Sequence, residues 1–108
     1  RNAIVARDIG ALGDIAEHNC LKMHSVMWTS RPPLVYWNST TVSCMETVRR
    51  LRSKGVPVFF TIDAGPQLKA VCEPGAADKV ESELAATGGV LRTLRTSLGT
   101  GAHLLDGE

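Results

Sequence analysis

The hydrophobic residues of this chain follow a helical period in three stretches, with strand-like runs between them. In the first helical stretch, residues 9–28, apolar residues recur three or four positions apart, which predicts an amphipathic helix that buries the stripe they form. The members of this stripe are Leu12, Ile15, Ala16, Met23, Val26 and Met27. We expect Asp8 to cap the start of the helix, and the run Arg31-Pro32-Pro33 prevents its continuation.

Strand and helix patterns alternate over the rest of the chain. Strands are expected at 34–37, 56–62, 67–72, 90–94 and 102–105, and helices from 42 to just before Gly55 and over 74–86. The second helix has alternative caps, since Ser43 and Glu46 have capping-box spacing and residues 39–41 are equally suitable. The order strand, helix, strand, strand, helix, strand predicts an α+β fold. It is the ferredoxin-like split βαβ arrangement (βαββαβ), preceded by an N-terminal helix.

Length and charge exclude several classes of protein. The 108 residues suit a single domain, 1–108, and the net charge of +1 gives no field that would attract nucleic acid or an anionic membrane. No apolar run approaches the roughly 20 residues of a membrane helix. Arg1 stands where a start methionine would, so we expect the chain to begin inside a longer polypeptide.

A basic cluster lies in the last turn of the second predicted helix, at Arg49, Arg50, Arg52 and Lys54. Such a cluster can bind phosphate or RNA, but it can also complement the negative end of the helix dipole on a solvated face. No aromatic residue is interleaved with it, which favours the dipole and argues against a nucleic-acid partner.

The cysteines and histidines allow a metal site to be considered. Cys20, Cys44 and Cys72 are widely spaced and odd in number, which favours reduced thiols buried as small hydrophobes in a cytoplasmic protein. On a helix, His18 lies about 200° from Cys20, so these two and His24 cannot converge on one ion. We therefore expect no metal ligands, and we expect His24 to be a histidine at the edge of the core or a hydrogen-bonded one.

A carboxylate stands at the end of the apolar strand 56–62. Asp63 is followed by Ala64, Gly65 and Pro66, whose small side chains let a ligand approach the backbone and its N–H groups. Asp63 could act there as a general base or accept a hydrogen bond from a substrate hydroxyl. The alternative is a turn aspartate whose carboxylate satisfies the local backbone, and composition alone favours this alternative.

Three segments together resemble one enzyme family. The run Thr61-Ile62-Asp63-Ala64-Gly65-Pro66, followed after two residues by Lys69, resembles the signature of diphosphomevalonate decarboxylases. Residues 13–24 resemble the family's helix with a Glu and an Asn before a Met-His pair, and residues 31–36 resemble its Pro-Pro start of a strand. The resemblance runs in order through nearly the whole chain and is weakest after Glu73.

This resemblance implies the C-terminal domain of an enzyme of the GHMP kinase superfamily, whose ferredoxin-like layout agrees with the strand order above. Such enzymes use ATP and Mg²⁺ to phosphorylate the 3-hydroxyl of mevalonate 5-diphosphate, and loss of phosphate and CO₂ yields isopentenyl diphosphate for isoprenoid biosynthesis. By position, Asp63 corresponds to the catalytic aspartate, and Ala64 and Gly65 to residues that lie against the substrate. The family also implies an N-terminal domain as partner, which binds most of the ATP and Mg²⁺, and a homodimer.

The chain departs from the family pattern in two ways. Gln67 replaces the usual Asn, which puts the hydrogen bonds of the loop in doubt. The Gly/Ser-rich ATP loop, the catalytic serine and the substrate-facing arginine have no match in the 108 residues, so we expect the isolated chain to be inactive. Two alternatives stay open: a mevalonate-type kinase or monophosphate decarboxylase of the same superfamily, and a non-catalytic ferredoxin-like binding module.

Overall fold

A computed structural model describes residues 1–105 of the chain. Its elements are α1 (Asn2–Val5), α2 (Ile9–Trp28), α3 (Ser39–Ser53), β1 (Val58–Thr61), β2 (Lys69–Cys72), the 3-10 helix η1 (Pro74–Ala76) and α4 (Ala77–Ala85). These elements confirm the α+β class and the three predicted helices. The short helix α1 was not predicted by the sequence pattern.

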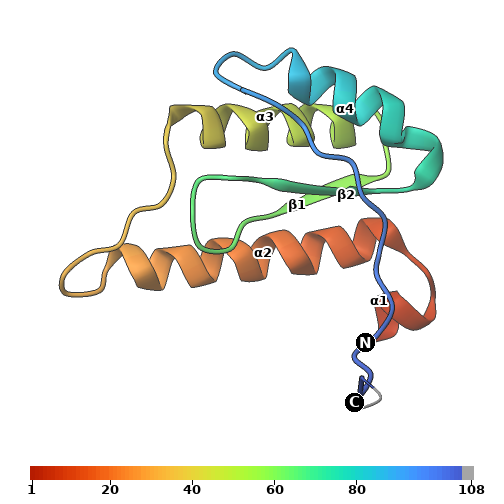
Figure 1. The fold of residues 1–108 in the computed structure, drawn as a ribbon, viewed down its shortest axis with the longest axis horizontal. Helices are drawn as coiled ribbons and strands as arrows, with labels where there is room; N and C mark the ends of the chain where they lie inside the picture. Colours follow the sequence, from red (N-terminus) through yellow and green to blue (C-terminus); the bar gives the residue numbers. More distant parts are fainter. Residues whose placement is uncertain (106–108) are drawn as a thin grey trace.

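The sheet is an antiparallel hairpin of β1 and β2. Val58 lies opposite Cys72 and Thr61 opposite Lys69, which confirms the strands expected within 56–62 and 67–72. The hairpin lies between α2 on one side and α3 with α4 on the other (Figure 1). The loop that joins the strands therefore opens at one end of this layered arrangement.

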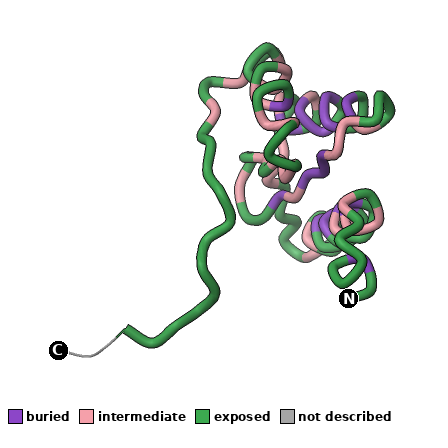
Figure 2. Tube along the Cα trace, turned by 90° about the vertical axis from the view of Figure 1, so that its right-hand side faces the viewer, coloured by how far each residue is buried: buried purple, intermediate pink, exposed green. Residues whose placement is uncertain are grey.

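Three of the expected strands are wrong. Within residues 1–105 the sheet has two strands, and 34–37, 90–94 and 102–105 form none. The segment 34–37 finds no place beside β1, because side chains of α2 already bond the edge of β1 that β2 leaves free. Residues 91–105 form a largely exposed extended segment (Figure 2), where Leu91 is 98% exposed and Thr93 and Arg95 bond side chains of α4. Although β2 has a free edge, residues 91–105 make no backbone hydrogen bond to it.

The face of α2 that packs on β1 differs from the one that the apolar period predicts. The buried residues of α2 are Gly13, Glu17, Cys20 and His24. The predicted stripe is only partly covered: Ile15, Met23 and Val26 are 51%, 43% and 69% exposed, while Leu12, Ala16 and Met27 are half-buried. The expectation was wrong because α2 lies against a strand edge, where backbone groups need polar partners.

Gly13 allows the close approach of α2 to β1. A Cβ added at Gly13 would lie 2.8 Å from Cβ of Phe59, closer than real Cβ atoms approach. Glycine at this point therefore brings the helix axis near enough for the side chains one and two turns further along to reach the strand backbone.

The helix ends are fixed by side-chain caps and a glycine. Asp8 accepts a hydrogen bond from the N–H of Ala11 at 2.9 Å, which confirms the predicted cap of α2. α3 is capped by Asn38, which forms a capping box with Thr41. The Ser43–Glu46 spacing therefore did not predict the cap of this helix. Gly55, with φ +81°, follows the end of α3 as predicted.

The core lies between the hairpin and the two helices α3 and α4. The buried residues of this cluster are Cys20, Met45, Val48, Leu51, Val58, Phe60, Ile62 and Val80. Phe60, Ile62 and Val48 are fully buried, which places the C-terminal end of β1 at the centre of the core. The loop after β1 thus begins from the most constrained part of the fold.

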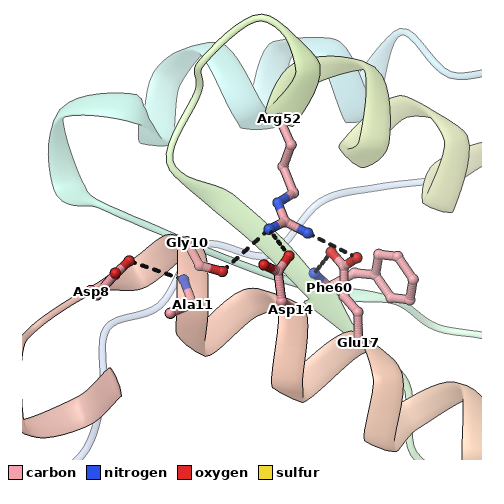
Figure 3. Close-up of polar contacts among 7 residues, drawn as sticks. All are labelled: Asp8, Gly10, Ala11, Asp14, Glu17, Arg52 and Phe60. Atoms are coloured by element: carbon pink, nitrogen blue, oxygen red, sulfur yellow. Dashed lines mark hydrogen bonds and ion pairs between the residues drawn. The ribbon is translucent and has the colours of Figure 1, made fainter. Parts of the chain in front are cut away.

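A polar network joins α3, α2 and β1 (Figure 3). The guanidinium of Arg52 donates to the Glu17 carboxylate at 3.1 Å, to Asp14 at 2.6 Å and to the Gly10 carbonyl at 3.3 Å. The other Glu17 oxygen accepts the N–H of Phe60 at 3.2 Å. Hydrogen bonding to Asp14 raises the pKa of Arg52, which secures the cation beside the buried Glu17 carboxylate.

Arg52 in this network belongs to the basic cluster at the end of α3, and two other cations of the cluster also contact groups of this chain. Arg50 pairs with Glu83 at 3.0 Å, and the Arg49 guanidinium lies 5.9 Å from the centre of the Phe60 ring. These cations are engaged with groups of the same chain.

We expect Arg52→Met to lower the free energy of unfolding by about 2–3 kcal/mol, because it leaves the buried Glu17 carboxylate without its counter-ion. The matched control is Arg50→Met, which breaks an exposed pair and should cost less than about 1 kcal/mol. Urea denaturation of the two variants measures the difference. Equal losses would show that the Arg52 network is no more important than a surface pair.

Candidate active site

Asp63 lies directly after β1, at the start of the loop that leads to β2. Its carboxylate pairs with the ammonium group of Lys69, across the base of the hairpin, and the two side chains are 64% and 56% exposed. Within the described residues the carboxylate makes no hydrogen bond to the backbone of its own loop. The turn interpretation of Asp63 therefore has no support, and the carboxylate is open to a ligand.

Ala64 and Gly65 follow as the outermost part of the loop. Their N–H groups make no hydrogen bond within residues 1–105, so both are free to donate. Gly65 has φ +103°, and a Cβ at this position would meet the Gln67 side chain, which folds back over it. The conformation therefore requires glycine, and the longer Gln67 occupies the space beside it.

The loop is held at its first carbonyl by two side chains of α2. The Nε2 atom of His24 lies 2.9 Å from the Ile62 oxygen, and Sγ of Cys20 lies 3.5 Å from the same oxygen. His24 is fully buried, which confirms the expected hydrogen-bonded histidine. Because a carbonyl only accepts, His24 carries its proton on Nε2.

The other end of the loop is held by α3. The hydroxyl of Thr41 donates to the Pro66 oxygen at 2.8 Å, while its N–H donates to Asn38 at 2.9 Å. One residue thus caps the helix and binds the loop. The sequence analysis missed this role of Thr41, although the Asn38–Thr41 spacing is itself a capping signal.

Trp37 packs against His24, and Trp28 packs against Trp37. The rings of His24 and Trp37 are 4.7 Å apart between centroids, and Trp28 meets Trp37 edge-on at 4.8 Å. Trp37 belongs to the segment expected as a strand, so this segment contributes an aromatic wall in place of backbone pairing. The His24 ring orientation is therefore fixed on both sides, by Ile62 and by Trp37.

The loop surface is open. Two recesses lie elsewhere, one around Arg52, Pro57 and Val58 and one between α1 and the hairpin near Phe59. Among the described residues, no group of three or more His, Cys, Asp or Glu side chains could hold a metal ion. No helix in this part of the chain is long and apolar enough to cross a membrane.

Comparison with known proteins gives concordant matches. A family model described as the mevalonate 5-diphosphate decarboxylase C-terminal domain matches residues 1–87. The phosphomevalonate decarboxylase of Haloferax volcanii is 31% identical over 98% of this chain and 32% of its own length. The diphosphomevalonate decarboxylase of Candida albicans is 25% identical over 94% of this chain and 33% of its own length. The chain spans about a third of the length of these relatives.

Solved structures agree. The mevalonate diphosphate decarboxylase from Enterococcus faecalis is similar with a TM-score of 0.74 and 35% identity, over 82% of this chain and 27% of that one. The enzyme from Staphylococcus aureus has a TM-score of 0.74 and 33% identity, over 78% and 25%. A further similar structure shows MDDEF in complex with MVAPP, AMPPCP and magnesium. The largely exposed segment 91–105 lies outside the match to the family model.

Stability should decrease at alkaline pH. Burial raises the pKa of the Cys20 and Cys44 thiols above 9.0, so the unfolded chain loses these protons at a lower pH than the folded chain. Their contribution is complete below the unfolded pKa and is lost as pH rises through the folded pKa. Urea unfolding should therefore give a constant free energy up to about pH 8 and a falling one above about pH 9.

The Cys44→Ala variant tests the cause, since burial alone raises the pKa of the Cys44 thiol. Its free energy of unfolding should fall less steeply above about pH 9 than that of the wild type. An identical slope in the two proteins would contradict the assignment to this thiol.

Proposed function

The chain belongs to the mevalonate 5-diphosphate decarboxylase C-terminal domain family, and we propose that the enzyme containing it converts mevalonate 5-diphosphate to isopentenyl diphosphate. In this proposal ATP phosphorylates the 3-hydroxyl, and phosphate and CO₂ leave. One observation carries the part assigned to this chain. It is an accessible carboxylate, Asp63, next to two free backbone N–H groups on a fixed loop.

The chemistry needs a group that handles the proton of the hydroxyl. A tertiary alcohol must be aligned, or lose its proton, as the γ-phosphoryl group arrives, and a carboxylate within hydrogen-bond reach serves both purposes. Lys69 contacts the Asp63 carboxylate and orients it. The N–H groups of Ala64 and Gly65 would donate to an anionic oxygen of the bound substrate.

ATP and Mg²⁺ do not fit a site built by this chain alone. The described residues offer no cluster of metal ligands, and Asp63 is paired with a lysine on an open surface. We assign the binding of ATP and Mg²⁺ mainly to the N-terminal domain of the enzyme. Phosphoryl transfer requires positioned, neutralised phosphates, so the isolated chain should be inactive.

The apolar face of α2 supports an N-terminal domain as partner. Ile15, Met23 and Val26 form an exposed stripe on a helix whose other side is fully engaged with β1. Exposed apolar surface of this kind marks an interaction site. We propose that the N-terminal domain covers this stripe, with a homodimer as the competing occupant. The free thiols of Cys20, Cys44 and Cys72 fit a cytoplasmic location.

A decarboxylase for the monophosphate is a second candidate. The Haloferax volcanii relative, 31% identical, is a phosphomevalonate decarboxylase. Both substrates carry the same 3-hydroxyl, so Asp63 would have the same role in each. Assays with mevalonate 5-phosphate and mevalonate 5-diphosphate side by side distinguish the two.

In the full-length enzyme, we expect Asp63→Asn to reduce CO₂ release from mevalonate 5-diphosphate by about 10²- to 10⁴-fold. The amide keeps the size of the side chain but cannot take a proton. Asp78→Asn is the matched control, since Asp78 is an exposed carboxylate paired with Arg95, and it should leave the rate unchanged.

Two results would count against this assignment. Near-native turnover by Asp63→Asn would remove Asp63 from the reaction. A phosphorylated product without CO₂ would indicate a kinase of the same superfamily.

The proposed partner surface has its own test. Val26→Lys should leave the stability of the 108-residue chain within about 0.5 kcal/mol, because this position is exposed. In the full-length enzyme the same change should lower the thermal midpoint, since it would bury a charge at the domain contact. If instead the isolated chain sediments as a dimer that Val26→Lys dissociates, the stripe is the homodimer contact.

A further inference from the structure

The loop that carries Asp63 is bound at its two ends and free at its centre. On one side His24 donates to the Ile62 oxygen at 2.9 Å, and on the other Thr41 donates to the Pro66 oxygen at 2.8 Å. Both donors are buried, with 0% and 2% of their surface exposed. Between the two bonded carbonyls lie three residues, Asp63, Ala64 and Gly65.

These three residues have few contacts of their own. Asp63 and Ala64 are exposed, and the N–H groups of Ala64 and Gly65 make no hydrogen bond within residues 1–105. The Asp63 carboxylate pairs with Lys69, and the backbone of the three residues is held by the two bonds at the loop ends, which come from different helices. Neither bond uses a group that a substrate would need.

The His24 bond has no substitute of equal strength. Cys20 also points at the Ile62 oxygen, but its Sγ lies 3.5 Å away and a thiol is a weak donor. Trp37 packs against the imidazole and fixes its plane. His24, packed against Trp37, therefore determines the position of the Ile62 carbonyl, which immediately precedes Asp63.

The Thr41 bond ties the loop to a helix end. The Asn38 side chain accepts the N–H of Thr41, and this capping box holds the hydroxyl in place for Pro66. The Thr41 hydroxyl has a single proton and two acceptors within reach, the Pro66 carbonyl and the Asn38 side-chain oxygen. The Pro66 oxygen is closer, and Asn38 already accepts the Thr41 N–H, so we assign the proton to the bond with Pro66.

We propose that His24 and Thr41 are positioning residues, which hold the Asp63–Gly65 loop at both ends so that the carboxylate and the two free N–H groups face the substrate together. This inference rests on the proposed function for its kinetic test. It adds that the rate depends on two buried side chains that touch neither the substrate nor Asp63.

The test uses the full-length enzyme and paired variants. His24→Leu and Thr41→Val remove the donor and keep the approximate volume. His24→Gln and Thr41→Ser keep a donor, since the Gln amide nitrogen reaches about as far as imidazole Nε2. Thr47→Val is the matched control, because Thr47 is a buried threonine of α3, 4% exposed, that bonds Thr87 and not the loop.

We expect kcat to fall by about 10²-fold in His24→Leu and Thr41→Val, as a small misplacement of a reacting group does, with KM for ATP unchanged. His24→Gln and Thr41→Ser should recover kcat to within about tenfold of the wild type, and Thr47→Val should match the wild type. The pH profile of kcat should keep its shape in His24→Gln. Loss of one limb there would show that His24 transfers a proton, and would overturn the proposal.

A second readout does not need turnover. Backbone ¹⁵N order parameters of Ala64 and Gly65 should fall toward about 0.6 in His24→Leu and Thr41→Val and stay at the wild-type value in the paired variants. Unchanged order parameters and unchanged kcat in Thr41→Val, which alters one hydroxyl, would overturn the proposal even if His24→Leu fails to fold. An inactive wild type with this pattern of order parameters would refute the proposed function while supporting the positioning role.

Discussion

The hydrogen bonds from α2 side chains to the free edge of β1 are the interaction on which the rest of the fold depends. A two-stranded hairpin leaves one edge of each strand unpaired, and each buried unpaired backbone group costs about 1–3 kcal/mol. Here Glu17 accepts the Phe60 N–H, and His24 and Cys20 donate to the Ile62 carbonyl. The helix takes the place of a third strand, and Arg52 neutralises the carboxylate that this arrangement buries.

This arrangement also explains what the sequence could and could not predict about the fold. Local signals were sufficient for the Asp8 cap, for the end of α3 at Gly55 and for the β1–β2 hairpin, because each depends on neighbouring residues. The hydrophobic period of α2 did not predict its packing face. The period shows on which side of the helix the apolar residues lie, but not which other element covers that side. In α2 half of the predicted apolar stripe is exposed, and the face with Glu17 and His24 is buried.

The candidate site divides in the same way. Asp63, Ala64 and Gly65 were identified from a run of consecutive residues, and in the structure Asp63 pairs with Lys69 at the start of β2. The side chains that hold the loop were not identified, because they lie 38 and 25 positions away in the chain. The i, i+4 spacing of Cys20 and His24 did show that they share a helix face. What that face meets is decided by tertiary packing.

Binding the loop through carbonyl oxygens resolves a conflict between order and access. A reacting carboxylate must be held within a fraction of an ångström, yet it must stay open to substrate. The Asp63 carboxylate pairs with the exposed Lys69 side chain, whereas bonds to the adjacent N–H groups would consume donors that a ligand needs. His24 and Thr41 instead bond the carbonyls of Ile62 and Pro66, which a substrate of this type has no use for. The bonds from the buried His24 and Thr41 side chains therefore hold the loop in place, and the N–H groups of the loop remain free to bind a ligand.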